Sequence, residues 1–487
     1  MRPSLRLVVI AAIGCGSSTT PPSPPPTVPI TNPAAPCEAS ITDVVVEAPP
    51  NPLARQLVVT LDAAAAVWAV CRPDADPDDA LLFESGTAKE VHRIDVTGMY
   101  SGEWTCRVVT ACRDADTETV ALQPQVPGPV PTFSATGTPS GPWTILNTQK
   151  GAAADGRRDV VIVDGAGRVR FQTEVVSFQR ADLDTSWTGE VVHIGGGWGL
   201  FETNIETRGL VRQLDLAGRV AYERLEPAFG EGYNHHSESL PDGEILSLTG
   251  TFHNVDGNRW NGIAVERLDP ETETVTWSWD SHDLVDAGLE GPLRGNPWNG
   301  NALAWTTDGL GEALWISLYT GQAMWRIDPA TGERTHVFGH DGDLVIVDAE
   351  GVPLPEREWV YGQHGPDFAD DGRVLLYDNG VDRPGGDQSR VAEFRLDLQA
   401  GTATLLWQWT EDDWYTPIIG DADYLPGGHV LITKGVVRAF TPFRRQPSAL
   451  IEVDPATDQV VWRLEPDDRP TPAIYRSQQY DGCALFR

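Results

Sequence analysis

The sequence predicts an all-β protein in which a small, immunoglobulin-like β-sandwich precedes a six-bladed β-propeller. The composition is typical of many short strands joined by turns, because the chain has 48 Gly, 38 Pro and 17 Trp but only 3 Met. Paired strand-like runs recur along the chain, and four of the six cysteines lie together ahead of these repeats. With 487 residues, 40% of them apolar, the chain is long enough to bury the cores of two or three domains.

The charge of the chain excludes one class of partner. The 36 Lys and Arg residues are outnumbered by 70 Asp and Glu residues, which gives a net charge of -34. A surface this acidic repels the phosphate backbone of DNA or RNA. We therefore expect no nucleic-acid partner.

The start of the chain is typical of an export signal. Arg2 and Arg6 precede an apolar run, LVVIAAIG, that is far shorter than the roughly 20 residues of a membrane-spanning helix. The sequence A-I-G-C resembles the lipobox of bacterial lipoproteins, which implies that residues 1–14 are a signal peptide and that Cys15 is acylated. The alternative is an ordinary secretory peptide with an incidental cysteine.

The segment after Cys15 predicts a tether. Residues 15–36 are rich in Pro, Ser and Thr and are expected to be disordered and extended. A lipid on Cys15 would then hold the folded part to the membrane of the cell envelope, in the periplasm or at the cell surface. No other segment is apolar enough to cross a bilayer.

Residues 37–125 predict the β-sandwich. Alternating runs such as RQLVVTLD and GEWTCRVVTAC are separated there by Pro, Asp and Gly clusters. Residues 126–142 are rich in Pro and Gly and predict a linker to the propeller, which is expected to span 143–487.

The cysteines predict disulfides, because an exported protein meets an oxidising environment. Two bridges are possible, with three alternative pairings, among Cys37, Cys71, Cys106 and Cys112. Cys483 is left over, as a free thiol or as part of a bridge back to this region.

The propeller prediction rests on six copies of one pattern, in which two short strand-like runs flank a turn rich in Asp, Pro and Gly. The copies are centred on Asp164, Asp215, Asp269, Asp328, Asp397 and Asp454. Their separations, between 51 and 69 residues, suit four-stranded blades. We interpret these aspartates as turn formers that bond nearby backbone N–H groups, rather than as metal ligands.

A second pattern precedes four of these copies and predicts the innermost strands. It consists of nine residues that close on a Gly turn: HHSESLPDG, NALAWTTDG, HGPDFADDG and GDADYLPGG. If these segments are equivalent, their first residues meet near the axis of the ring. These residues are His235, Asn301, His364 and Gly420.

The stretch QHGPDFADDGRVLLYDNG, followed by SRVAEF, resembles the bacterial arylsulfate sulfotransferase family. The resemblance covers roughly residues 143 to 480. It implies a six-bladed, periplasmic propeller that passes a sulfuryl group from an aryl sulfate to an active-site histidine and then to a phenol. No nucleotide cofactor takes part in that reaction.

The resemblance also implies roles for particular residues. His364 matches the nucleophile, His235 the acid/base histidine, with His236 as an alternative residue facing the channel, and Asn301 the site asparagine. Two family positions differ.

Asn299 stands where a histidine is expected, and Tyr319 stands where an arginine is expected. Both are uncharged hydrogen-bond donors that can bind sulfuryl oxygens. We therefore expect the missing positive charge to come from another residue. Arg390 is the first candidate, with Lys434 and Arg438 as alternatives.

Two functions remain open from the sequence. The first is a lipoprotein enzyme that transfers sulfuryl groups between phenolic compounds, without a cofactor. The second is a catalytically inactive propeller that binds a ligand or a protein partner in the same funnel. Hydrolysis of a sulfate ester is a weaker third possibility, because nothing positions a water. No zinc spacing or calcium loop occurs, so a metal-free site is expected.

Overall fold

The computed structural model of the protein describes residues 39–112, 117–125, 131–149, 158–174, 190–194, 197–201, 211–224, 232–255, 258–286, 300–435, 447–467 and 473–480. Strands dominate these residues, and the helical elements among them are α1 (His282–Asp286) and a 3₁₀ turn (Glu356–Glu358). No helix in the described ranges is long and apolar enough to span a bilayer. Cys15, Cys37 and Cys483 lie outside the described residues.

The N-terminal region forms a five-stranded antiparallel sheet around its own core. Its strands are β1 (Ile41–Glu47), β2 (Arg55–Pro73), β3 (Leu81–Val96), β4 (Trp104–Thr110) and β5 (Thr117–Leu122). The first half of β2 pairs with β1 and its second half with β4, and buried side chains from both halves share one core. A disulfide joins Cys71 to Cys106 across β2 and β4, and Cys112 is also disulfide-bonded. The immunoglobulin-like topology stays a prediction.

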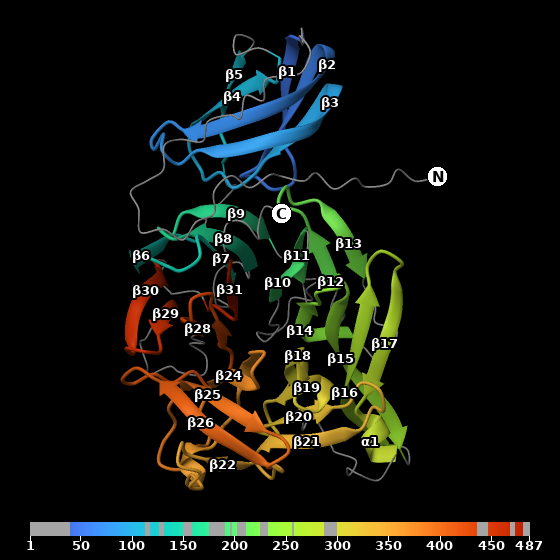
Figure 1. Ribbon diagram of the computed structural model, residues 1–487, viewed down its shortest axis with the longest axis vertical. Coiled ribbons are helices and arrows are strands. Elements are labelled where there is room, and N and C mark those ends of the chain that lie inside the picture. Colours follow the sequence, from blue (N-terminus) through green and yellow to red (C-terminus); the bar gives the residue numbers. More distant parts are fainter. Residues whose placement is uncertain are drawn as a thin grey trace.

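The remaining strands form the sheets of a propeller (Figure 1). From the inside outward, the first sheet is β31 (Ser477–Tyr480), β7 (Trp143–Gln149), β8 (Arg158–Asp164) and β9 (Val169–Glu174). The next group is made of two hairpins, β10 (Glu190–Ile194) with β11 (Gly197–Phe201), and β12 (Val211–Leu214) with β13 (Val220–Arg224). The third sheet is β14 (Gly232–Ser239), β15 (Ile245–Val255), β16 (Asn258–Asp269) and β17 (Thr274–Asp280).

Three more sheets complete the ring. The fourth is β18 (Gly300–Asp308), β19 (Gly311–Leu318), β20 (Ala323–Ile327) and β21 (Arg334–Gly339). The fifth is β23 (His364–Phe368), β24 (Arg373–Asp378), β25 (Arg390–Asp397), β26 (Thr402–Trp409) and β22 (Val345–Val347). The sixth is β27 (Asp421–Tyr424), β28 (Val430–Lys434), β29 (Ala449–Asp454), β30 (Gln459–Pro466) and β6 (Phe133–Gly137).

The innermost strands contact one another in a closed cycle, as a propeller requires. β31 contacts β10, and the contacts continue through β14, β18, β23 and β27, while β28 returns to β31. The all-β class and the propeller architecture are therefore confirmed. One expectation was wrong: the predicted linker 126–142 contributes β6, which pairs with β30 because Phe133 enters the core there.

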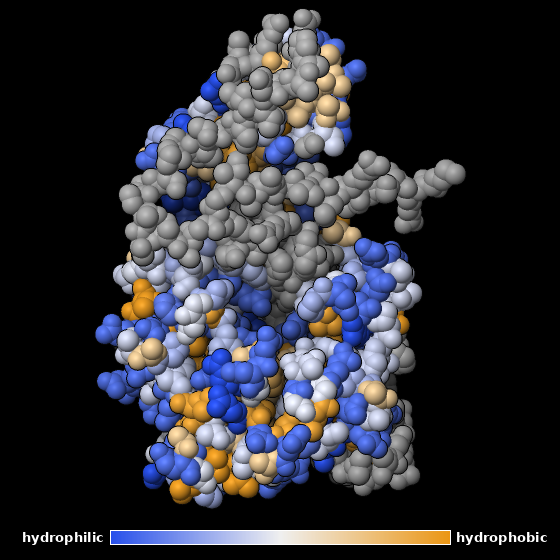
Figure 2. All heavy atoms as spheres, in the orientation of Figure 1, coloured by the Kyte–Doolittle hydropathy of each residue, from blue (hydrophilic) through white to orange (hydrophobic). Residues whose placement is uncertain are grey.

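The core of the propeller lies between neighbouring sheets. One cluster, for example, joins Leu248 and Val265 of the third sheet to Ile316 of the fourth. The repeated aspartates behave as turn formers: the Asp164 carboxylate accepts bonds from two backbone N–H groups of its own turn, and Asp454 accepts one. Figure 2 shows that hydrophilic residues cover most of the described propeller surface on the face in view, with smaller hydrophobic patches between them.

The N-terminal sheet packs against the ring beside the outer strands β9 and β13 (Figure 1). Arg170 of β9, only 2% exposed, pairs with Asp79 of the N-terminal region, and Arg219 pairs with Asp95. The backbone N–H of Asn51 donates to the carbonyl of Ala217 at 2.8 Å. These contacts join the two regions on the outside of the ring.

Candidate active site

Two histidines distant in sequence meet beside one tyrosine. His364 is the first residue of β23, and its ring lies 6.4 Å from the Tyr475 ring, centroid to centroid. The Tyr475 hydroxyl lies 3.3 Å from Nδ1 of His235 in β14. His235 has a φ of 55°, which is a left-handed backbone conformation. The pairing of β14 with β15 is irregular at this point, between Tyr233 and Ser237. The structure thus brings His235 and His364 together.

The hydrogen bonds of His364 fix its tautomer. The Asn379 amide nitrogen donates to the carbonyls of Thr416 (2.6 Å) and Ile419 (2.8 Å), so its Oδ1 is the atom that faces His364. Oδ1 lies 2.7 Å from Nδ1 of His364, and the Gly362 carbonyl lies 3.3 Å from the same atom. Because both neighbours are acceptors, Nδ1 carries the proton. The other ring nitrogen, Nε2, therefore keeps its lone pair.

The surroundings of His364 keep the imidazole neutral. The side chain is only 4% exposed, and this burial lowers its pKa to about 3; the charges of Arg476 and His235 also lower it, whereas the bond to Asn379 raises it. Desolvation likewise lowers the pKa of His236 well below its ordinary value. A buried, neutral imidazole with an unprotonated Nε2 is a nucleophile at neutral pH.

Asn301 links the backbone next to His364 to Arg476. Its side-chain nitrogen donates to the Gln363 carbonyl at 2.7 Å, directly before His364, and its own carbonyl accepts a bond from Arg476 Nη2 at 2.6 Å. The Asn301 side-chain oxygen is buried and has no hydrogen-bond partner among the described residues. Gln363 is anchored by bonds from its amide to the carbonyls of Leu318 and Ala323.

An acidic cavity of about 250 Å³ adjoins this site. Its lining includes His236 and Arg476, together with carboxyl groups from three innermost strands: Glu238, Asp367, Asp421 and Asp423. Desolvation raises the pKa of all four carboxyls, that of Glu238 to about 8. No group of His, Cys, Asp and Glu side chains among the described residues has the arrangement needed to hold a metal ion.

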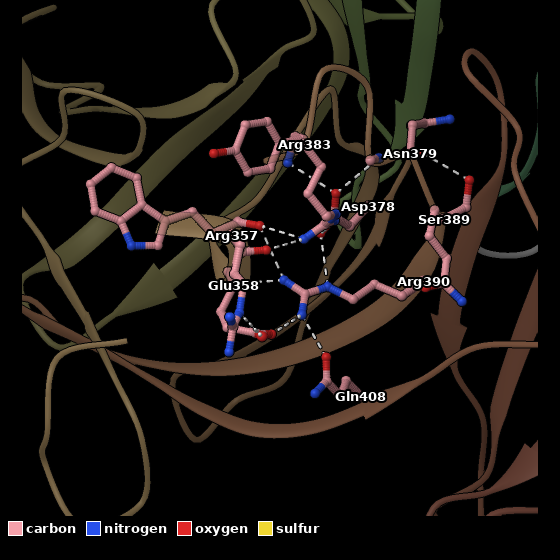
Figure 3. Close-up of polar contacts among 12 residues, drawn as sticks. Arg357, Glu358, Asp378, Asn379, Arg383, Ser389, Arg390 and Gln408 are labelled. Atoms are coloured by element: carbon pink, nitrogen blue, oxygen red, sulfur yellow. Dashed lines mark hydrogen bonds and ion pairs between the residues drawn. The ribbon is translucent and has the colours of Figure 1, made fainter. Parts of the chain in front are cut away.

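Arg390, the first candidate for the missing cation, serves a different purpose (Figure 3). All five of its N–H donors are engaged: they bond the Asp378 carboxylate, the side chains of Glu358 and Gln408, and two backbone carbonyls. The prediction that Arg390 binds substrate was therefore wrong, because it has no donor left for a sulfate. Lys434 is likewise paired, with Glu411 at 2.7 Å.

Tyr319 and His236 lie near the site but have other partners. The Tyr319 ring lies 5.4 Å from that of His364, and its hydroxyl donates to the Pro417 carbonyl at 2.8 Å. Nδ1 of His236 accepts the backbone N–H of Leu303 at 2.6 Å. Asn299 and Arg438 lie outside the described residues.

Sequence reasoning missed three residues of this site, Asn379, Tyr475 and Arg476. Asn379 lies in the D-N-G turn that ends the stretch QHGPDFADDGRVLLYDNG, and the sequence alone indicated no role for it. The other two lie in the segment IYRSQQYDG at 474–482, which has nine residues and closes on Gly like the four segments that were aligned. That shared length was the available signal, since β31 is indeed an innermost strand.

A relative of known name and several solved structures are similar to parts of this chain. The arylsulfate sulfotransferase AssT from Lelliottia amnigena is 26% identical over 188 residues, which cover 34% of this chain and 31% of that protein. Among solved structures, TolB from Acinetobacter baumannii is similar with a TM-score of 0.38 and 13% identity, over 78% of this chain and 80% of TolB. The Dos1 propeller has a TM-score of 0.33 and 11% identity, over 68% of this chain and 74% of that one.

The family comparison covers most of the propeller. The model of the arylsulfotransferase (ASST) family matches residues 144–476, which run from β7 to the arginine just before β31. The matched range includes both histidines, Asn301 and Asn379. The chain therefore belongs to the arylsulfotransferase family.

Proposed function

We propose that this protein transfers a sulfuryl group from an aryl sulfate to a phenol through a sulfated His364, without a nucleotide cofactor. The observation that carries the proposal is the hydrogen bonding and burial of His364, which assign its tautomer. Its Nδ1 proton is held by Asn379, its pKa is lowered to about 3, and Nε2 is left as a neutral nucleophile beside a second histidine. Family membership supports the same reaction.

The proposed reaction has two steps. In the first, Nε2 of His364 attacks the sulfur atom, the N–S bond forms as the bond from sulfur to the aryl oxygen breaks, and protonated His235 gives its proton to the departing phenoxide. In the second, His235 takes the proton of the acceptor phenol, the phenol oxygen attacks sulfur, and the N–S bond breaks. The enzyme returns to its starting state, and one phenol has replaced another.

A chromogenic donor tests this function. The purified full chain is expected to release nitrophenol from nitrophenyl sulfate only when an acceptor phenol is present. His364→Gln is expected to abolish this release. His282→Gln is the matched control, because His282 is equally buried at 4% exposure but bonds Asp280 in another part of the ring.

The same assay separates the two functions that the sequence left open. Folded wild-type protein that binds nitrophenyl sulfate but never releases nitrophenol would contradict the enzyme and favour the inactive binding propeller. The observation behind this alternative is that Tyr319, at the family's arginine position, commits its hydroxyl to Pro417.

We further propose that the protein is exported and tethered by a lipid on Cys15. The disulfide between Cys71 and Cys106 supports export, since disulfides persist mainly in oxidising compartments. Labelling cells with radioactive palmitate is expected to mark the wild-type chain and not Cys15→Ser. Equal labelling of the two, or no labelling of either, would contradict the tether.

A further inference from the structure

The geometry points to Arg476 as the cation that binds the transferred sulfuryl group, and we propose that it does so from the segment that closes the ring. This inference rests on the proposed transfer reaction and names a residue outside the four aligned segments. The transferred group carries negative charge on the oxygen atoms around sulfur, so a fixed cation at that point holds the group in place and stabilises the transition state. The position expected for this cation holds Tyr319 instead.

The backbone places Arg476 firmly at the site. The Asn147 side-chain oxygen, in β7, accepts the backbone N–H groups of Tyr475 (2.9 Å) and Arg476 (3.1 Å). Tyr475 contacts both histidines, and the next residue is Arg476. Because β31 and β7 are paired, the closure of the ring itself fixes this segment.

Hydrogen bonds link the side chain of Arg476, through Asn301, to the residue before His364. Its Nη2 donates to the Asn301 carbonyl, and the Asn301 side chain donates to the carbonyl of the residue that precedes His364. Arg476 is only 8% exposed and lines the cavity together with His236. Its charge also acts on His364 and His236, lowering the pKa of both.

The other cations considered for this role are engaged elsewhere. Arg390 bonds Asp378 of the neighbouring strand β24 and Glu358 of the 3₁₀ turn, and Lys434 bonds Glu411. The planar guanidinium of Arg476 matches two oxygens of a sulfate better than an ammonium group does. A purely structural role, in which Arg476 only offsets the carboxyls of the cavity, is the competing explanation.

The test compares two buried arginines in the full chain. Arg476→Ala is expected to lower kcat/KM for nitrophenyl sulfate by at least about 100-fold, since removal of one transition-state donor has an effect of that order. Arg476→Lys is expected to lose about tenfold. The control is Arg326→Ala, because Arg326 is 2% exposed and pairs with Asp308; it is expected to lower thermal stability and to leave kcat/KM within about threefold of wild type.

Two further readouts separate binding from structure. Added guanidinium ion, at concentrations that do not unfold the protein, is expected to restore part of the activity of Arg476→Ala and none of that of His364→Gln. A folded Arg476→Ala with wild-type kcat/KM would overturn the inference. If Arg476→Ala does not fold, Arg476→Lys decides, and a kcat/KM equal to wild type in that variant would equally overturn it.

Different measurements test the role of Arg476 and the proposed function. If the wild-type chain shows no turnover, the proposed function fails, and calorimetric binding of nitrophenyl sulfate then tests Arg476 alone. Binding by wild type that Arg476→Ala weakens at least tenfold supports the inference. Equal binding by the two, or no binding by wild type, overturns it.

Discussion

Arg390 and Arg476 are both buried arginines of the propeller, but their surroundings differ. Arg390 meets Asp378, itself 0% exposed, at 2.9 Å, and four further acceptors occupy its remaining donors (Figure 3). Arg476 bonds a backbone carbonyl and shares a cavity with carboxyl groups whose pKa values are raised. In the first region opposite charges meet and build structure; in the second an arginine and carboxyl groups with raised pKa values line one cavity.

The two regions are also connected. Asp378, which Arg390 holds, accepts the backbone N–H groups of Tyr361 and Gly380, on either side of the His364–Asn379 pair. The ion pairs therefore shape the turn that carries Asn379. This difference predicts that variants of the Arg390 network change mainly stability, whereas variants around His364 change mainly catalysis.

A large catalytic effect is expected from Asn379→Leu. This change removes the acceptor that holds the Nδ1 proton of His364, so the ring can take the wrong tautomer, and we expect kcat to fall at least about 100-fold. Asn379→Asp is the matched variant, because it also loses the bonds to Thr416 and Ile419 but keeps an acceptor for Nδ1. Steady-state kinetics should show the larger loss in the leucine variant; equal losses would contradict the tautomer argument.

Arg390→Met is expected to produce the largest loss of stability. It takes one of two arginine partners from a fully buried carboxylate, the other being Arg383, and breaking such a pair typically costs about 3 kcal/mol. Urea denaturation should show this decrease in the free energy of unfolding. Unchanged stability together with a loss of kcat/KM would show that Arg390 serves catalysis rather than structure, and would contradict the distinction between the two arginines.

The acidic cavity predicts a dependence on pH. The pKa of Glu238 is about 8 in the folded protein and near 4.5 in the unfolded chain, so between these values the folded state keeps a proton that the unfolded state releases. The free energy of unfolding should therefore fall as pH rises from about 4.5 to about 8. Above this range the Glu238 contribution should stay constant.

The same ionisation affects the substrate. A negatively charged cavity repels an aryl sulfate, so kcat/KM is expected to fall about tenfold as the pH rises through the pKa of Glu238. Glu238→Gln should reduce both pH dependences when stability and kinetics are measured across this range. A variant with the wild-type profile would exclude Glu238 as the titrating group.

The smallest effect is expected from Tyr319→Phe. The Tyr319 hydroxyl proton is committed to the Pro417 carbonyl, so its loss should change KM for the aryl sulfate by less than about threefold. A much larger rise in KM would show that Tyr319 binds the sulfuryl oxygens after all, as the sequence suggested.

The sequence predicted most of the ring and only part of the site. Nine-residue segments that end on a Gly turn were enough to align His235, Asn301 and His364, because each blade repeats the same local pattern. The strand β6 was not predicted, because its pairing with β30 joins residues more than 300 positions apart. The surrounding sequence is also rich in Pro and Gly, which is typical of a linker.

The cation was missed for a related physical reason. Arg390 lies just past the D-N-G turn, which made it the natural candidate, but neither its burial nor its five hydrogen bonds can be read from local sequence. Arg476 lines the cavity together with His236 because the last strand closes the ring beside β7. Long-range closure of this kind leaves no signal in spacing except the length of its own segment.

Direct detection of the intermediate tests the central claim. Wild-type protein would be mixed with nitrophenyl sulfate in the absence of acceptor, quenched rapidly at alkaline pH, digested and analysed by mass spectrometry. We predict that the peptide containing His364 gains the mass of one SO₃ group and loses it when a phenol is added before the quench. Nitrophenol release that depends on acceptor, with no modified histidine at any time point, would contradict the account.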